Sequence, residues 1–276
     1  MILKNKIALI VGGAGGIGQA VASLFLKEGA RVIIASRSEA DLISVSEKLN
    51  AIYPGRISFL VVDVSVASAV KKMVEQVISD YGAINILISG AGIYGPIGLS
   101  HEVDLDDWIK TYEVNVFGTF NLFRAVVPHM IKQGGGKIVN FSGGGDGPLP
   151  RFSAYNSSKA AIVRLTETLA EEVKEWNIEV NCIAPGAVNT KLLDEALRAG
   201  EAKLGHQKYS ELLKQKQGGG VLPEKAAQLC LFLGSSKSDG LSGRFLSAVW
   251  DNYEEWDEDK IKLIMSQNLY TYRRVK

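Results

Sequence analysis

The sequence is poor in the residues that build metal sites and disulfides. Its 276 residues include two cysteines and three histidines. Cys182 and Cys230 lie in apolar runs without metal-ligand spacing, so we expect both to be buried as small hydrophobic side chains. His101, His129 and His206 share no such spacing either. The sequence therefore predicts no metal site and favours a reducing, cytoplasmic setting.

Charge of one sign and long apolar runs are also missing. The net charge is +1 and no basic block occurs, which predicts no nucleic-acid partner. The longest early apolar run, Ile7–Val11, is too short to span a bilayer and lacks signal-peptide anatomy, so we expect a strand and no membrane association. With 46% hydrophobic and 22% charged residues, the balance is that of an ordinary soluble globular protein.

Short β-branched runs recur along the chain. They are nearly continuous in apolar residues, as expected for parallel strands buried on both faces. The expected strands are residues 6–13, 30–37, 57–64, 84–92, 136–144, 178–186 and 243–250.

Amphipathic stretches separate these strands. The expected helices are residues 17–28, 38–49, 67–81, 105–132, 154–176 and, near the last strand, 225–233. Ser38 followed by Asp41 is a plausible helix start. The alternation predicts an α/β fold with a doubly wound parallel sheet of about seven strands. No linker-like change of composition divides residues 1–276, so we expect a single domain.

Two segments depart from this rhythm. Residues 189–222 are helical and charged and end in three glycines, Gly218–Gly220, which suggests a lid with flexible hinges, or else a surface insertion. Residues 251–276 form an acidic, then apolar tail with helical character beyond the sheet.

The stretch LIVGGAGGIGQAV reads as a strand, a glycine-rich turn and a helix. Such a turn lets the backbone approach a ligand, and the helix N-terminus offers unpaired N–H groups to an anion. Dinucleotide binding is predicted, although two glycine spacings are present, G-x-x-x-G-x-G and G-x-x-G-x-x-G. The residues concerned are Gly12, Gly15, Gly16, Ile17 and Gly18.

The end of the second strand bears on the choice of cofactor. An acidic residue there would bind the 2′-hydroxyl of NAD(H), but Ser36 occupies this position and Arg37 follows it. An arginine can bind a 2′-phosphate, and Ser36 and Ser38 add hydroxyl groups. We therefore expect NADP(H) rather than NAD(H). Asp63, with Val64 beside it, is placed to meet the adenine; a helix-starting aspartate is the alternative.

Tyr155 and Lys159 are four residues apart, so they share one face of a helix. A neighbouring cation lowers the pKa of a phenol, which would allow Tyr155 to exchange a proton with a substrate oxygen. Ser142, at the end of the strand KIVNFS, could hydrogen-bond the same oxygen. Together these residues predict proton transfer at a carbonyl or alcohol.

These features occur in an order and spacing that resemble the short-chain dehydrogenase/reductase superfamily over about residues 4–250. The resemblance rests on the glycine turn, Asp63, Asn115 in NVFG, Ser142, YNSSK and APG (184–186). It implies a Rossmann fold and hydride transfer between a nicotinamide and a secondary alcohol or ketone. Family relatives usually form homodimers or homotetramers, here through residues 105–132 and 154–176.

The resemblance also implies residue roles. Tyr155 would be the general acid/base, and Lys159 would lower its pKa and bind the nicotinamide ribose. Ser142 would orient the substrate oxygen, and Asn115 would hold a water in a proton relay. Further cofactor contacts would come from Gly90, Ala91, Gly92, Pro185, Gly186, Val188 and Thr190.

The sequence departs from the family at three points. Val11 replaces a threonine before the first turn glycine, and Ser89 replaces an asparagine that braces neighbouring strands, so we expect Ser89 or water to take over some of its hydrogen bonds. AVWDNYEEW replaces the glycine pair that is common after the last strand.

Two other functions remain open at this stage. A nucleotide-sugar epimerase or dehydratase shares Tyr-x-x-x-Lys, although those relatives usually carry a larger C-terminal domain. A non-catalytic, NADP-binding redox sensor would be expected to lose catalytic groups. The small-molecule alcohol or carbonyl substrate is not identified, although Tyr94, Leu149 and Arg151 are candidates to shape its pocket.

Overall fold

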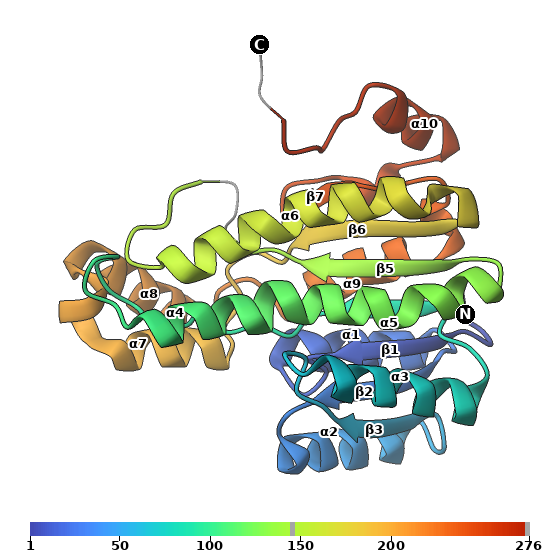
Figure 1. The fold of residues 1–276 in the computed structure, drawn as a ribbon, viewed down its shortest axis with the longest axis horizontal. Coiled ribbons are helices and arrows are strands. Elements are labelled where there is room, and N and C mark those ends of the chain that lie inside the picture. Colours follow the sequence, from blue (N-terminus) through green and yellow to red (C-terminus); the bar gives the residue numbers. More distant parts are fainter. Residues whose placement is uncertain (144–146, 274–276) are drawn as a thin grey trace.

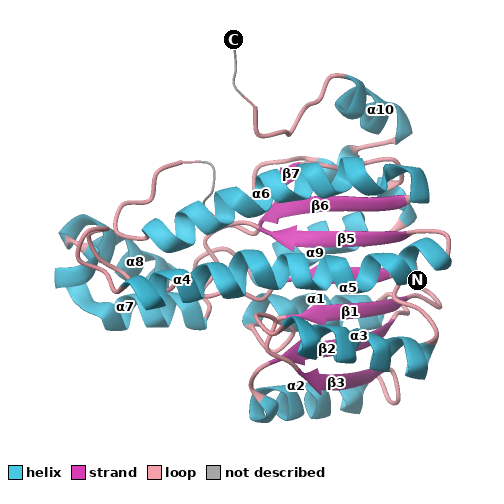
Figure 2. Ribbon diagram, viewed as in Figure 1, coloured by secondary structure: helices cyan, strands magenta, loops and turns pink. Residues whose placement is uncertain are grey.

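A computed structural model describes residues 1–143 and 147–273 and contains a seven-stranded, all-parallel sheet with helices on both faces (Figures 1 and 2). The strand order is β3-β2-β1-β4-β5-β6-β7, which confirms the predicted doubly wound sheet. The strands are β1 (Ile7–Val11), β2 (Arg31–Ser36), β3 (Ile57–Val61), β4 (Ile86–Ser89), β5 (Gly136–Phe141), β6 (Ile178–Ala184) and β7 (Phe245–Ser247). The last of these is much shorter than the eight residues predicted.

Burial on both faces explains why the strands are apolar throughout. Side chains alternate along a strand. In β1, Ala8 and Ile10 therefore pack into one core cluster, whereas Leu9 and Val11 pack into the cluster on the opposite face. Ser89 at the end of β4 is buried, and its hydroxyl donates a long hydrogen bond of 3.5 Å to Thr119, one of the compensations expected for the missing asparagine.

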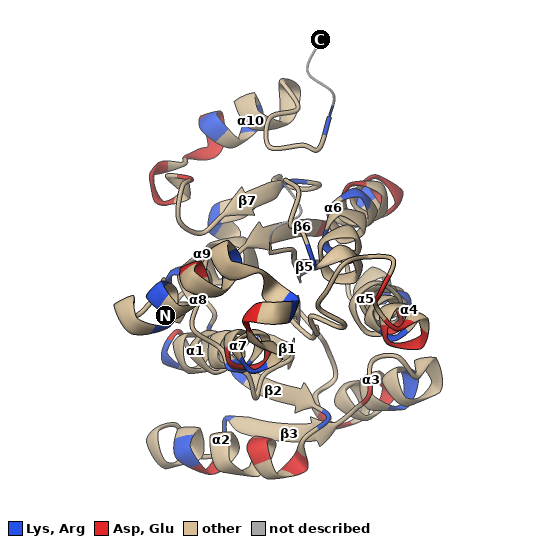
Figure 3. Cartoon of the chain, turned by 90° about the vertical axis from the view of Figure 1, so that its left-hand side faces the viewer, with Lys and Arg blue, Asp and Glu red and all other residues tan. Residues whose placement is uncertain are grey.

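The helices divide between the two faces of the sheet. Helices α1, α2 and α9 contribute side chains to one core cluster, and α3, α5 and α6 contribute to the other. Figure 3 shows α1 and α9 on one side of the sheet and α3, α5 and α6 on the other. Their bounds are α1 (Gly16–Lys27), α2 (Glu39–Ile52), α3 (Ala67–Tyr81), α5 (Gly118–Lys132), α6 (Ser153–Val173) and α9 (Pro223–Gly234). Ser38 is the N-cap of α2 and accepts a hydrogen bond from Asp41 N, as its position suggested.

The helix expected over residues 105–132 is not regular. It consists of α4 (Leu105–Tyr112), a π-helical segment η1 (Glu113–Phe117) and α5. Such a bulge adds one residue to a turn and is frequent at functional sites. Here it contains Asn115. Similarly, the predicted helix 154–176 ends in a 3₁₀ turn, η2 (Lys174–Trp176).

Beyond the carboxyl ends of the strands lie α7 (Lys191–Leu204) and α8 (His206–Gly218), formed by the predicted insertion (Figure 1). Gly200 interrupts α7 with non-helical dihedral angles. After α8, Gly219 and Gly220 have left-handed backbone angles. The apolar sides of both helices pack against Phe152 and Tyr155.

The C-terminal tail lies beyond β7, the edge strand, as predicted, and its apolar side chains join the core (Figure 1). After η3 (Ser236–Ser238) and β7 it forms η4 (Tyr253–Glu255) and α10 (Glu258–Ser266), and Tyr253, Ile261 and Ile264 join the core. The carbonyl of Tyr270 accepts a hydrogen bond from Phe245 N at the edge of β7. Residues 274–276 of the predicted tail lie outside the described part of the chain.

Candidate functional site

A cavity of about 830 Å³ lies at the carboxyl ends of the strands, below α7 and α8. The strand order switches between β1 and β4, because the chain adds β2 and β3 on one side of β1 and β5, β6 and β7 on the far side of β4. Ligands bind at this switch point in sheets of this kind. Most predicted site residues line this cavity: Gly12, Gly15, Gly16, Ile17, Gly18, Ser36, Arg37, Ser38, Val64, Gly90, Ala91, Gly92, Tyr155, Pro185, Gly186, Val188 and Thr190. Asp63, Asn115, Ser142 and Lys159 are not part of its wall.

The glycine turn is held by close backbone contacts. Gly12 has a φ of +85°, and a Cβ there would lie 2.7 Å from the backbone of Gly90. A Cβ on Gly18 would overlap the carbonyl oxygen of Gly12. Around Gly16, in contrast, the nearest atom is Thr190 Cγ2 at 3.9 Å, so this glycine faces open space. Gly12 and Gly18 are thus needed to build the turn, whereas Gly16 leaves room above it.

This turn presents the N-terminus of α1 to the cavity. The N-cap residue is Gly15, so no side chain caps the first N–H groups, and the first turn carries no acidic residue. Gly15, Gly16 and Ile17 all line the cavity. Unpaired N–H groups and the positive end of the helix dipole form a site for an anion such as a pyrophosphate.

The next part of the wall is formed by the end of β2. The hydroxyl oxygen of Ser36 is buried and has no hydrogen-bond partner among the described residues. Arg37 and Ser38 line the cavity beside it. A buried polar atom without a partner is costly, so a polar group of a ligand is the natural partner for Ser36.

The structure places the carboxylate of Asp63 away from the cavity. It accepts hydrogen bonds from the backbone N (2.9 Å) and hydroxyl (2.6 Å) of Ser65, and the hydroxyl contact is the main reason why the pKa of Asp63 is lowered. The residues on either side, Val62 and Val64, do line the cavity. In this structure Asp63 stabilises the turn that leads into α3, and its neighbours form this part of the cavity wall.

Tyr155 and Lys159 both lie on α6 and are almost entirely buried, with 8% and 5% of their surface exposed. The Lys159 ammonium donates a hydrogen bond to the carbonyl of Phe141 (2.9 Å) and lies 5.7 Å from the centre of the Tyr155 ring. The helix thus brings the two residues together at one end of the cavity, although only Tyr155 reaches its wall.

Burial decides the protonation of this pair, and it corrects one expectation. Burial raises the pKa of Tyr155 above the usual value of a phenol, and the nearby Tyr94 raises it further. The expected lowering by Lys159 is not seen, because desolvation by burial dominates the shift. Burial also lowers the pKa of Lys159 to about 8.

Ser142 follows β5 directly and is 3% exposed. Its hydroxyl donates a hydrogen bond to the backbone carbonyl of Lys159 (3.3 Å) instead of facing the cavity. The next residue, Gly143, lines the cavity with a φ of +135°, and a Cβ there would lie 2.7 Å from the Tyr155 hydroxyl. Gly143 therefore makes room for this hydroxyl, a role that the sequence did not reveal because it depends on a contact across two elements.

Asn115 lies in the π-helical segment and is fully buried. Its side-chain amide donates to the carbonyl of Ile93 (3.0 Å) and the hydroxyl of Ser158 (2.9 Å), and its Oδ1 accepts from Ile93 N (2.9 Å). A Cβ on Gly92 would lie 3.3 Å from both Asn115 Oδ1 and Lys159 Nζ. Asn115 thus joins the loop after β4 to α6, close to Lys159.

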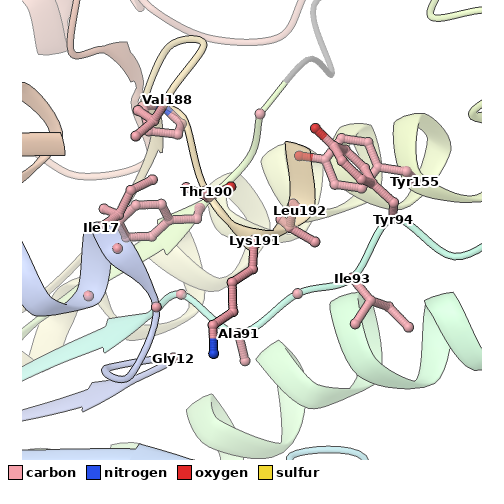
Figure 4. A pocket seen from close by; sticks show the side chains of 18 of the residues that line it. Gly12, Ile17, Ala91, Ile93, Tyr94, Tyr155, Val188, Thr190, Lys191 and Leu192 are labelled. Carbon is pink, nitrogen blue, oxygen red and sulfur yellow. The ribbon is translucent and has the colours of Figure 1, made fainter. Parts of the chain in front are cut away.

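The far side of the cavity is formed by the segment after β6 and the start of α7 (Figure 4). Gly186 has a φ of +85°, and Val188 makes a β-bridge to Val221. Lys191, the first residue of α7, lines the cavity and forms a 2.7 Å ion pair with Asp41 of α2. These residues lie 150 positions apart, so no sequence pattern could have indicated that they meet.

Other lining residues were missed or only partly anticipated. Leu149, Phe152, Leu192 and Leu212 form an apolar end of the cavity near Tyr155. Arg151 does not line it; its guanidinium donates to the carbonyls of Ala202 (3.3 Å) and Lys203 (3.0 Å) at the end of α7. From beyond β7 come Trp250, Asp251 and Tyr270, which the unusual sequence after the last strand could have suggested.

The stability of the protein should rise with pH as Lys159 titrates. Burial lowers its folded-state pKa from 10.5 to about 8, so the unfolded chain binds more protons between these values, and the free energy of unfolding increases over that range. Between pH 7 and pH 9 the gain from this group is about 1 kcal/mol. Denaturant unfolding at pH 7, 8 and 9 should show this gain relative to Lys159→Met, which cannot titrate. Parallel pH curves for the two proteins would contradict it.

The residues of the cavity fit a nicotinamide dinucleotide. The glycine turn, in which added Cβ atoms would clash, leaves backbone N–H groups open to a pyrophosphate. Ser36 offers a buried hydroxyl without a partner in the described part of the chain. In residues 1–143 and 147–273, no group of three His, Cys, Asp or Glu side chains could hold a metal ion. No helix in those ranges is long and apolar enough to cross a membrane.

Comparisons with known proteins agree with this fold. The family model described as short chain dehydrogenase matches residues 6–200. The chain is 36% identical over 248 residues to the 3-oxoacyl-(acyl-carrier-protein) reductase FabG of Thermotoga maritima, covering 89% of this chain and 97% of the relative.

Solved structures give the same result. An NAD⁺-bound xylitol dehydrogenase superposes with a TM-score of 0.82 at 27% identity, covering 90% of this chain and 98% of the other. A 3-ketoacyl-(acyl-carrier-protein) reductase from Brucella melitensis complexed with NADH superposes with a TM-score of 0.77 at 27% identity, covering 89% and 97%.

Proposed function

The chain belongs to the short-chain dehydrogenase/reductase family and is an NAD(P)-dependent oxidoreductase of CH–OH and C=O groups, and from this premise we propose that it interconverts a ketone and a secondary alcohol with NADP(H). One observation carries the proposal: the anion site of the glycine turn and Tyr155 line the same cavity. The relatives that resemble the chain include reductases of oxo groups, which supports the carbonyl as the reacting group.

The bound nicotinamide supplies or accepts the hydride, and the protein supplies the proton. Because burial raises its pKa, Tyr155 is a neutral phenol near pH 7 and can donate its proton to a carbonyl oxygen during reduction. A positive charge on Lys159 would stabilise the resulting phenolate, and we propose that Lys159 also binds the nicotinamide ribose. Ser142 would orient the substrate oxygen after its hydroxyl turns from the Lys159 carbonyl, and Asn115 would hold a relay water beside Lys159.

The remaining cofactor contacts are also proposals. The N–H groups of Gly16 and Ile17 would bind the pyrophosphate beside Gly15, whose own N–H donates to the carbonyl of Gly12. Gly90–Gly92 and Val64 would contact the adenosine and its ribose, whereas the predicted contact of the Asp63 carboxylate would require it to leave Ser65. Pro185, Gly186, Val188 and Thr190 would face the nicotinamide. Helices α7 and α8, which cover the cavity, would act as a lid over the reacting groups.

NADP(H) selectivity is proposed from Arg37 and the neighbouring hydroxyls. We expect NADPH to bind more tightly than NADH, and Arg37→Ala to weaken NADPH binding about tenfold to a hundredfold while changing NADH binding little. Fluorescence titration of the purified protein with each cofactor measures both affinities. Lys48→Ala is the matched control, since Lys48 is exposed on α2, carries the same charge and does not line the cavity.

Equal affinity for NADPH and NADH, unchanged by Arg37→Ala, would contradict NADP(H) selectivity. Failure of both cofactors to bind would contradict the proposed function itself.

We also propose that the enzyme is a cytoplasmic homodimer or homotetramer. Large apolar side chains on the outer face of α4 to α5 are exposed, namely Leu105, Ile109, Phe117 and Phe120, and a second copy of the chain could cover them. Cys182 and Cys230 are free and buried, which is compatible with a reducing compartment. Light scattering that found monomers, or cell fractionation that found the protein outside the cytosol, would contradict this.

A further inference from the structure

Tyr94 lies beside Tyr155 at the substrate end of the cavity. It belongs to the loop after β4, two residues beyond Gly92, and both tyrosines line the cavity. Their rings meet edge to face with centroids 4.6 Å apart, and Phe152 contacts the other side of Tyr94 at 5.2 Å. In Figure 4 the two rings lie side by side, with their hydroxyl oxygens toward the same side of the cavity.

The hydroxyl of Tyr94 has no hydrogen-bond partner in the described part of the chain, and the same is true of Tyr155. Burial raises the pKa of Tyr94, and the carboxylate of Glu195 raises it further. The group therefore remains protonated and can donate a hydrogen bond near pH 7. Tyr94 lines the cavity, so its hydroxyl can donate to a ligand atom or a water there.

Packing alone does not explain the hydroxyl. A phenylalanine would make the same ring contacts with Tyr155 and Phe152. Tyr94 thus adds a single feature to the cavity, a second donor next to the proposed acid. Tyr94 is also among the causes that raise the pKa of Tyr155.

The rest of this end of the cavity is mainly apolar. Leu149, Phe152, Leu192 and Leu212 line the cavity, and all come from the lid or from the loop before α6. Leu149, Phe152 and Leu212 belong to the same apolar cluster as the two tyrosines. Glu195 also lines the cavity and would repel a carboxylate near Tyr94. The cation of Lys208, which lines the cavity from α8, is paired with Glu211 at 3.3 Å. The ligand that fits is therefore an uncharged molecule with an apolar arm and two oxygens close together.

We propose that Tyr94 is a substrate-binding residue that donates a hydrogen bond to a second, neutral oxygen next to the reacting carbonyl, so that the substrate is a vicinal diketone or α-hydroxyketone with an apolar arm. This inference rests on the proposed function. In the reduction, a hydride adds to one carbonyl carbon, the electron pair of the C=O π bond moves to oxygen, and that oxygen takes the proton of Tyr155. The second oxygen keeps its bonds and only accepts the hydrogen bond from Tyr94.

The test compares 1-phenylpropane-1,2-dione with 1-phenylpropan-1-one, which lacks the second oxygen. We expect wild-type enzyme to reduce the dione with NADPH, and Tyr94→Phe to lower kcat/KM for the dione about tenfold, mostly through KM. The same variant should change kcat/KM for the monoketone, where it is turned over, less than about twofold. The dione is intrinsically more reactive than the monoketone. The comparison is therefore between the ratios of kcat/KM for wild type and variant, measured separately for each ketone.

Tyr209→Phe is the matched control, because Tyr209 packs against the same apolar cluster but does not line the cavity. It should leave the kinetics with the dione unchanged. A loss in Tyr94→Phe that is equal for both ketones would show a structural role and overturn the proposal. No loss with the dione, or no turnover of the dione by an enzyme that binds NADPH, would overturn it as well. A wild-type protein that binds neither NADPH nor NADH would instead refute the proposed function.

Discussion

Replacement of Tyr155 by phenylalanine is expected to lower kcat for ketone reduction by about 10²–10⁴-fold and to leave the affinity for NADPH unchanged. The substitution removes one oxygen from a ring that is 8% exposed, so the packing around it is kept. What is lost is the only proton-donating group that the proposal places at the reacting oxygen. Steady-state kinetics with the dione and a fluorescence titration with NADPH measure the two quantities separately.

Two controls sharpen this result. Tyr209→Phe makes the same chemical change in the lid and should retain activity. Thermal unfolding of Tyr155→Phe should match the wild type, because the Tyr155 hydroxyl makes no hydrogen bond within the described residues. Substantial turnover by Tyr155→Phe would refute the assignment of Tyr155 as the acid, and cofactor loss would show that its role is structural.

Replacement of Gly18 by alanine is expected to disrupt the cofactor site. The new Cβ would overlap the carbonyl oxygen of Gly12, and because both partners are backbone groups the turn must shift. We expect a loss of about 3 kcal/mol in the free energy of unfolding, at the upper end of overpacking effects. A displacement of this kind should also weaken NADPH binding about a hundredfold.

Gly16→Ala is the matched control for stability. It adds the same methyl group two residues earlier, where the nearest atom is 3.9 Å away. Since alanine favours the helix that begins at Gly16, this variant should be at least as stable as the wild type. Thermal or denaturant unfolding of both variants measures the difference. Equal stability of Gly16→Ala and Gly18→Ala would show that the contact with Gly12 does not constrain the turn.

The sequence predicted the parallel sheet and the glycine turn of the site, for physical reasons. Continuous apolar runs indicated strands buried on both faces, and β1 divides its side chains between two core clusters as such a strand must. The choice between two glycine spacings could not be made from sequence, because both include Gly12 and Gly18. The space around Gly16 and the contact of Gly18 with Gly12 become visible only when the backbone is folded.

The electrostatic predictions were less successful. Spacing places Lys159 one turn after Tyr155 on α6 and led us to expect a lowered phenol pKa. The folded protein buries both groups, and desolvation instead raises the pKa of Tyr155 and lowers that of Lys159. Similarly, the order of residues placed Ser142 and Asp63 at strand ends, but hydrogen bonds to Lys159 and Ser65 decide where their polar groups point.

By itself, the sequence determined what depends on local spacing: the strand–turn–helix at Gly12–Gly18, the pairing of Tyr155 with Lys159 and the family. Only the tertiary structure decided what depends on packing between distant segments. It brought Lys191 to Asp41 across 150 residues, placed Gly143 against the Tyr155 hydroxyl and set Tyr94 beside it. Burial and contacts between separate elements exist only in the folded chain, and they determine protonation and the shape of the substrate end of the cavity.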